Sequence, residues 1–212
     1  MMKDEFALET AAPQNPWVIT MAASAGGIRA LQIVLGALPR DLPAAVVVVQ
    51  HRAASSQPNH LQRILTRATE LPVVVAADDQ LIEPGHLYLA RSDLHLTVSP
   101  DRRFEYVDGR RIRFLLSSAN PLFESAAAVF KDHLVAVVLT GTGSDATDGV
   151  QGVRANGGLV IAQDPSSAEH AGMPASAISS GSVDLVLPLE QIGPALDAIV
   201  RGRLIVDGAP HV

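Results

Sequence analysis

Length and composition predict a single globular domain, because the 212 residues are 48% hydrophobic and 18% charged and can build one large core. The chain contains no cysteine, which excludes disulfides, a thiol nucleophile and thiolate-bound metals. Its net charge of −6 comes without a Lys/Arg block, and no apolar run reaches the roughly 18 residues that span a bilayer, so we expect neither a nucleic-acid partner nor membrane insertion.

The N-terminal half predicts alternating strands and helices. Residues 1–16 are polar and contain two prolines, and we expect a disordered leader there. This leader has acidic residues and no signal-peptide pattern, so the cytoplasm is the expected compartment. Apolar β-branched runs predict buried parallel strands, and amphipathic segments predict helices between them. The predicted strands are 17–21, 45–50 and 73–75, and the predicted helices are 28–38 and 61–65.

The middle of the chain has a different pattern. Three short candidate strands, 86–90, 94–98 and 104–107, follow one another closely. This spacing leaves no room for crossover helices, so we expect an antiparallel hairpin or meander added to the sheet.

The C-terminal half returns to alternating elements. The predicted helices are 121–133, 147–156, a short one after Met173-Pro174, and 189–200; the predicted strands are 134–140, 158–162 and 184–187. The expected fold is therefore α/β and doubly wound, with a mostly parallel sheet, helices on both faces and the antiparallel insertion. We expect the domain to cover 17–202, followed by a C-terminal tail at 203–212.

Three polar residues come just after three of the predicted strands. Ser24, His51 and Asp145 follow the runs at 17–21, 45–49 and 134–139. Parallel strands end at the same edge of a sheet, so these residues should meet in one crevice. A Ser, a His and an Asp together indicate acyl transfer, with Ser as nucleophile, His as base and Asp orienting the imidazole.

Each of these residues also has a simpler interpretation. Ser24 could only cap the helix that follows it, and a lone His at a strand end is often a structural, partly buried residue. Asp145, or the second candidate carboxylate Asp148, could simply cap the next helix. Capping explains Asp148 well, whereas Asp145 lies closer to the strand end and is better placed to reach His51.

The sequence shows no clear pattern of a metal site or a nucleotide site. Six further histidines lack the spacing of metal ligands, and we expect most of them at the surface. The Gly-rich segment 139–149 lacks the Gly-Lys-Ser/Thr ending of a P-loop. We therefore expect no metal and no cofactor.

Five motifs carry a family resemblance. They are Ala23-Ser24-Ala25-Gly26-Gly27, Gln50-His51, residues 84–90, residues 139–145 and Gly172-Met173-Pro174. In this order they resemble the catalytic domain of CheB, the protein-glutamate methylesterase of bacterial chemotaxis, over roughly residues 17–200.

The resemblance implies hydrolysis of glutamyl methyl esters on a methylated chemoreceptor, with release of methanol, and deamidation of receptor glutamines. It implies that Ser24, His51 and Asp145 form the triad. Substrate-binding residues are expected at Ala25, Thr142, Gly143 and Met173. Backbone N–H groups near Ala25, His51 or Thr142 would form the oxyanion hole.

Regulation and substrate leave alternatives open. The resembled family carries a receiver domain before the catalytic domain, and this sequence shows none, so we expect constitutive activity or control by a separate regulatory protein. Two other functions also fit the residues: a catalytically weak signalling or binding module, and an esterase or amidase acting on a small metabolite.

Overall fold

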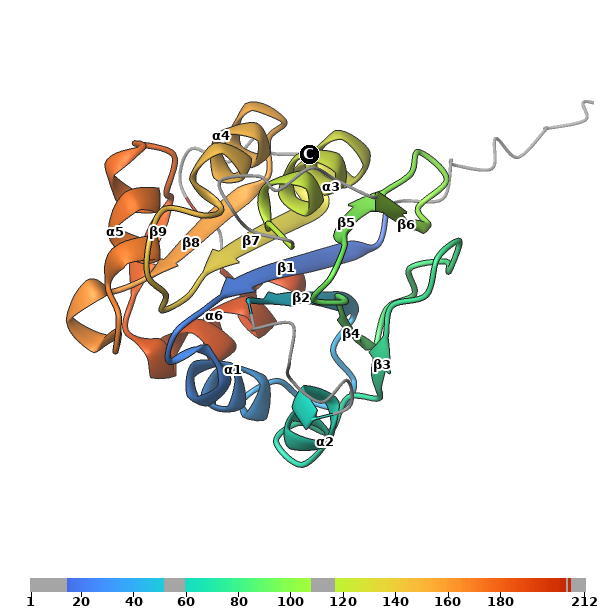
Figure 1. Ribbon diagram of the computed structural model, residues 1–212, viewed down its shortest axis with the longest axis horizontal. Helices are drawn as coiled ribbons and strands as arrows, with labels where there is room; N and C mark the ends of the chain where they lie inside the picture. The colour runs from blue at the N-terminus through green and yellow to red at the C-terminus, as the bar shows by residue number, and fades with distance from the viewer. Residues whose placement is uncertain (1–14, 52–59, 108–116, 205, 207–212) are drawn as a thin grey trace, which may run out of the picture.

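A seven-stranded parallel sheet forms the centre of the molecule (Figure 1). The computed structural model describes residues 15–51, 60–107, 117–204 and 206. The strand order is β3-β4-β2-β1-β7-β8-β9. The strands are β1 Trp17–Ala23, β2 Ala44–Gln50, β3 Val73–Val75, β4 Leu87–Leu89, β7 Leu134–Val138, β8 Leu159–Gln163 and β9 Leu185–Leu187. The predicted doubly wound α/β fold is confirmed.

Helices cover both faces of the sheet. They are α1 Gly27–Gly36, α2 His60–Thr66, α3 Asn120–Phe130, α4 Thr147–Ala155, α5 Gly172–Ser179 and α6 Leu189–Val200, with short 3-10 helices η1 Lys131–His133 and η2 Pro165–Ser167. Within the described part of the chain, no helix is long and apolar enough to cross a bilayer.

The core consists of two apolar layers, one on each side of the sheet. Because side chains alternate along a strand, Ile19 and Met21 of β1 face α1 and α6, whereas Val18 and Ala22 face the layer of α3, α4 and α5. Both faces of the central strands are therefore buried, which explains their continuous apolar runs.

One predicted feature differs from the structure. The segment at 86–90 was expected in an antiparallel meander, but β4 lies parallel between β2 and β3 in the main sheet. Only β5 His95–Val98 and β6 Phe104–Val107 form an antiparallel pair, and they make a separate two-stranded sheet.

The β3–β4 crossover explains this difference. The connection contains no helix; instead its loop is hydrogen-bonded to β6, with Asp79 N donating to Phe104 O (2.8 Å) and Phe104 N to Gln80 O (2.9 Å). Leu96 and Phe104 of the hairpin pack in the same apolar layer as α3. The hairpin thus covers part of the sheet face that a crossover helix would otherwise cover (Figure 1).

The predicted chain ends lie mostly outside the described residues, so the leader and tail stay predictions. Of the leader, Asn15 and Pro16 are described, and Asn15 donates a hydrogen bond to Val129 O (3.1 Å). Of the tail, Arg203, Leu204 and Val206 are described, and Val206 is buried against the core.

Candidate active site

Strand register makes Ser24 and His51 neighbours at the carboxyl edge of the sheet. Ala23 at the end of β1 pairs with Gln50 at the end of β2, so Ser24 and His51 are the next residues on adjacent strands. Parallel neighbours are spaced by about 4.8 Å, which sets the distance between these two backbones. The His51 N–H donates to Ala23 O (3.0 Å) and continues the ladder past the strands.

The same edge is the switch point of the sheet. Strands are added on one side of β1 in the first half of the chain and on the other side, from β7, in the second half. Ser24 lies at this point, because its N–H donates to Thr140 O (3.0 Å) just beyond β7. Ligands of open α/β sheets bind in the crevice at such positions.

Two glycines shape the turn that carries Ser24. Gly26 has a φ of 74°, in the left-handed region where a Cβ is strained. Gly27 opens α1, and a Cβ there would lie 2.3 Å from Gln50 Oε1. Glycine at these positions therefore allows the sharp strand-to-helix turn and the close approach of Gln50.

Gln50 ties the Ser24 and His51 segments together. Its side-chain Nε2 donates to Ser24 O (2.9 Å) and to His51 O (3.0 Å). The residue is 7% exposed, and its Oε1 has no hydrogen-bond partner among the described residues. One buried amide thus fixes the backbones of both segments.

His51 and Asp145 are in direct contact. The Nε2 of His51 lies 2.8 Å from Oδ2 of Asp145, and the two side chains are 10% and 3% exposed. The distance is short, but the ring N–H is not aligned well enough for a full hydrogen bond. Catalytic hydrogen bonds that are poorly aligned without substrate commonly become shorter and better aligned when substrate binds. The contact selects Asp145, which is buried, over Asp148, which is exposed on α4.

Asp145 is held from its other side by the segment before α3. Ser118 Oγ donates to Oδ1 (2.6 Å), and Ala119 N donates to Oδ2 (2.8 Å). Burial by itself would raise the pKa of Asp145, but the interactions with His51, Ser118 and Ala119 outweigh it and hold the pKa below its ordinary value. The carboxylate is therefore ionised at neutral pH.

Hydrogen bonding narrows the set of oxyanion donors. The His51 N–H is already used by Ala23 O, and the Gly141 N–H by His170 O (2.9 Å). Among the described residues, the N–H groups of Ala25 and Thr142 have no acceptor. These two amides remain available to a developing oxyanion.

Gly141 packs directly against the Ser24 side chain. A Cβ at Gly141 would lie 2.8 Å from Ser24 Cβ and 2.2 Å from Met173 Sδ. Thr140, next to it, donates through Oγ1 to Ala25 O (3.1 Å) and accepts from His170 N (2.8 Å). The Gly-rich segment thus contacts the Ser24 turn through both Gly141 and Thr140 and holds it in place.

The predicted substrate-binding residues differ in exposure. Ala25 is half-buried, and Thr142 and Gly143 are exposed at the same edge. Met173 is completely buried, and its sulfur lies against Gly141. Its side chain packs against the Gly141 loop, and its role in substrate binding stays a prediction.

Sequence reasoning missed the residues that hold the three candidates in place. Gln50 had one usable signal, since it is a polar residue at the end of a completely buried strand. Ser118 had none, because it lies in the loop before α3, and the predicted strand 94–98 that contains His95 gave no sign of a contact with Ser118. His95 is also an exception to the expected surface position of the histidines, since it is 2% exposed.

Two further features bear on ligands. A cavity of about 340 Å³ lies between α1 and the start of α6, beside Gly26, Arg29 and Glu190, and neither Ser24, His51 nor Asp145 lines it. No cluster of three or more His, Asp or Glu in the described residues could hold a metal ion.

Comparisons with known proteins identify the family. Residues 19–196 match the family model described as CheB methylesterase. A relative from Leptospira interrogans is 40% identical over 178 residues, which cover 84% of this chain and 92% of that protein. The protein-glutamate methylesterase/protein-glutamine glutaminase of group 3 operon from Rhizobium meliloti is 40% identical over 191 residues, and the match covers 90% of this chain but only 54% of that protein.

A solved structure agrees with these matches. The CheB methylesterase catalytic domain of Thermotoga maritima superposes with a TM-score of 0.82 at 33% identity, covering 87% of this chain and 98% of that one. The similarity thus extends over the sheet and its helices.

Proposed function

Because the chain belongs to the CheB methylesterase family, we propose that it hydrolyses glutamyl methyl esters on a chemoreceptor-like protein, with deamidation of glutamine as a related reaction. The observation that carries the proposal is the 2.8 Å contact between His51 Nε2 and Asp145 Oδ2 beside the Ser24 turn. In this proposal, Ser24 is the nucleophile, His51 the base and Asp145 the orienting carboxylate.

The proposed first step forms an acyl-enzyme. His51 Nε2 faces Asp145, which leaves Nδ1 to take the Ser24 hydroxyl proton as Oγ attacks the ester carbonyl. The imidazolium that forms is paired with the Asp145 carboxylate. The N–H groups of Ala25 and Thr142 would stabilise the oxyanion, and His51 then returns its proton to the departing methoxide, which leaves as methanol.

The second step releases the product. Water attacks the glutamyl ester of Ser24, His51 accepts its proton at Nδ1, and the proton passes to Ser24 Oγ as the bond breaks. The products are a glutamate carboxylate and free enzyme. With a glutamine substrate, the leaving group of the first step is ammonia instead of methanol.

Methanol release from receptor-containing membranes tests the proposal. The membranes carry chemoreceptor with tritiated methyl esters, and wild type is compared with Ser24→Ala. Ser166→Ala, a change of an exposed serine on η2, is the matched control. We expect methanol from wild type and the control only. Cleavage of small soluble esters without receptor demethylation would favour the metabolite esterase, and no serine reactivity would favour the binding module.

A further inference from the structure

A buried hydrogen-bonded chain extends behind Asp145, away from His51. Ser118 Oγ bonds Oδ1 of Asp145, and Ala119 N bonds Oδ2, so each carboxylate oxygen has an anchor besides His51. Ser118 and Ala119 are 1% and 0% exposed. The carboxylate therefore cannot rotate without breaking both bonds in a place that water does not reach.

The direction of the Ser118 hydroxyl is set by its other bond. Asn120 N donates to Ser118 Oγ (3.2 Å), which occupies an acceptor site of the hydroxyl. An ionised carboxylate can only accept, so the Ser118 hydrogen is directed to Asp145. A hydrogen bond from a hydroxyl to an ionised carboxylate is among the strong hydrogen bonds of proteins.

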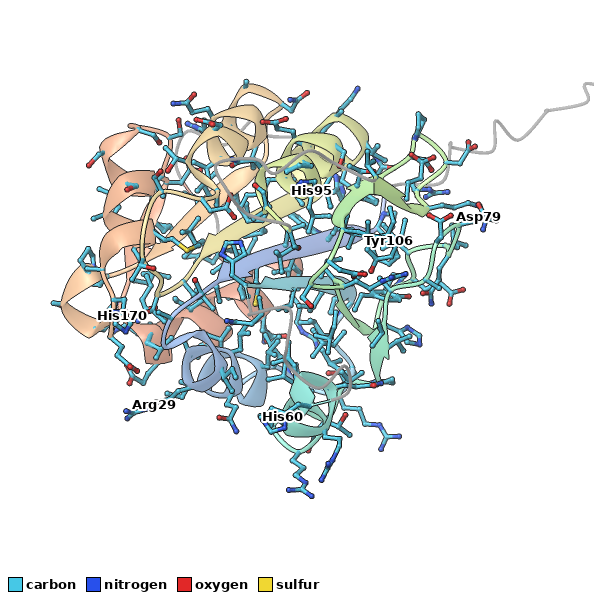
Figure 2. All side chains as sticks on the ribbon, in the orientation of Figure 1. Arg29, His60, Asp79, His95, Tyr106 and His170 are labelled. Carbon is cyan, nitrogen blue, oxygen red and sulfur yellow. The ribbon has the colours of Figure 1, made fainter. Side chains whose placement is uncertain are left out.

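His95 holds the backbone of Ser118. The Ser118 N–H donates to Nδ1 of His95 (3.0 Å), so Nδ1 carries no hydrogen and the neutral ring is protonated at Nε2. Nε2 is buried without a hydrogen-bond partner among the described residues. Figure 2 shows His95 in the interior beside α3, whereas the labelled His60 and His170 lie at the periphery.

We propose that Ser118 and His95 are positioning residues of the active site. His95 fixes the Ser118 backbone, and the Ser118 hydroxyl fixes the Asp145 carboxylate in the orientation that meets His51. This inference rests on the proposed function of Ser24, His51 and Asp145. It predicts that replacing Ser118 or His95 slows the chemical step and leaves substrate binding unchanged. Both residues are buried behind Asp145, on the side away from His51.

The proposal also predicts a change in pH dependence. Without the Ser118 donor, the negative charge of Asp145 is less dispersed and attracts the proton on His51 more strongly. We therefore expect the acid limb of the rate profile to move to higher pH in Ser118→Ala. A residue that only supports the fold would lower the amount of active protein without moving this limb.

The experiment measures the rate of Ser24 labelling by a fluorophosphonate probe, and in parallel methanol release, across pH. In Ser118→Ala we expect kcat to fall about tenfold with KM nearly unchanged, and the acid limb to shift to higher pH for both readouts. Ser118→Thr keeps the hydroxyl and should restore most of the rate. Ser117→Ala removes a neighbouring buried serine with no bond to Asp145 and is the control.

His95 is tested by its own pair of variants. His95→Asn offers an amide oxygen to the Ser118 N–H and should retain most activity, whereas His95→Leu offers no acceptor and should resemble Ser118→Ala. If Ser118→Ala fails to fold, this pair of variants still tests the positioning role. An unmoved acid limb in Ser118→Ala, or equal rates for His95→Leu and His95→Asn, would overturn the positioning role.

The two readouts separate this inference from the proposed function. Probe labelling requires the triad but no receptor. If wild type labels but releases no methanol, the proposed substrate is wrong, and the labelling profile still decides the role of Ser118. If wild type does not label, both proposals fail.

Discussion

His51 presents Nε2, not Nδ1, to Asp145, with 2.8 Å between Nε2 and Oδ2. The carboxylate thereby favours the tautomer with hydrogen on Nε2 and a free electron pair on Nδ1. Ser24 follows the strand next to that of His51, so in the proposed mechanism Nδ1 is the nitrogen that takes the proton of its hydroxyl. The triad proposal therefore assigns Nε2 to the carboxylate and Nδ1 to the nucleophile.

Replacement of Ser24 tests the nucleophile. Ser24→Ala should fold as wild type does, because the side chain is half-buried and small, and it should lose at least about a thousandfold in kcat. The measurement is methanol release together with mass spectrometry of the probe-labelled protein. Turnover that matched wild type would eliminate the acyl-enzyme.

The choice between two carboxylates is tested by a pair of variants. Asp145→Asn should lower kcat by up to about ten-thousandfold, since an amide at this position favours the wrong imidazole tautomer. Asp148→Asn, on the exposed surface of α4, should change kcat little. Steady-state rates at neutral pH compare the two, and a larger loss in Asp148→Asn would assign the role to the other residue.

Asp145 also predicts how stability depends on pH. Because its pKa is lower in the folded protein than its ordinary value, its ionised form stabilises the fold above about pH 4, and this contribution is lost as the pH falls further. Urea unfolding of wild type should therefore show a falling free energy of unfolding below about pH 4. Asp145→Asn should show a shallower fall over the same range, and equal slopes would contradict the lowered pKa.

The three candidate residues could be predicted because they follow strands with a strong apolar pattern. Strand ends converge in a parallel sheet, so the placement of Ser24, His51 and Asp145 needed no knowledge of the loops. The helix at 189–200 and the strand at 73–75 were also predicted with the bounds that the structure shows. The helix has an amphipathic period of apolar residues, and the strand is a run of β-branched residues, so both patterns are strong.

Other features depend on contacts between distant segments. The position of β4 in the parallel sheet depends on a crossover loop that is held by β6, and the loop itself has no periodic pattern. The support of Asp145 depends on Ser118, which lies 27 residues earlier in the chain. Met173 was expected to bind substrate. Its complete burial depends on packing against Gly141, a residue of a distant segment, and therefore could not be predicted from the sequence.

Gln50 predicts a coupling between the Ser24 and His51 segments. Gln50→Glu keeps the size of the side chain but replaces the Nε2 donor with an acceptor, which would face the two carbonyls of Ser24 and His51. We expect a fall in kcat and a loss of about 1–3 kcal/mol in the free energy of unfolding, because both carbonyls lose their donor. Gln62→Glu is the control; this half-buried glutamine on α2 has a side chain that, among the described residues, bonds Val73 O alone. Unchanged kcat in Gln50→Glu would show that backbone bonds alone hold the two segments.

The close packing of Gly141 against Ser24 indicates that packing, as well as backbone hydrogen bonds, sets the position of Ser24. In Gly141→Ala the new methyl would overlap Met173 Sδ and approach Ser24 Cβ to 2.8 Å. The methionine is buried and cannot swing into solvent, so we expect the overlap to displace Ser24 and to lower both stability and kcat. Thermal unfolding and methanol release measure the two effects.

A double variant separates these two overlaps. Gly141→Ala with Met173→Ala removes the clash with sulfur but leaves the approach to Ser24 Cβ. Stability should therefore recover relative to Gly141→Ala alone, whereas kcat should stay low. Gly152→Ala on α4 is the matched control, because the atom nearest to its methyl would be Cγ of the Glu124 side chain, at 3.3 Å, and alanine favours the helix. Full recovery of kcat in the double variant would show that Gly141 acts on Ser24 only through Met173.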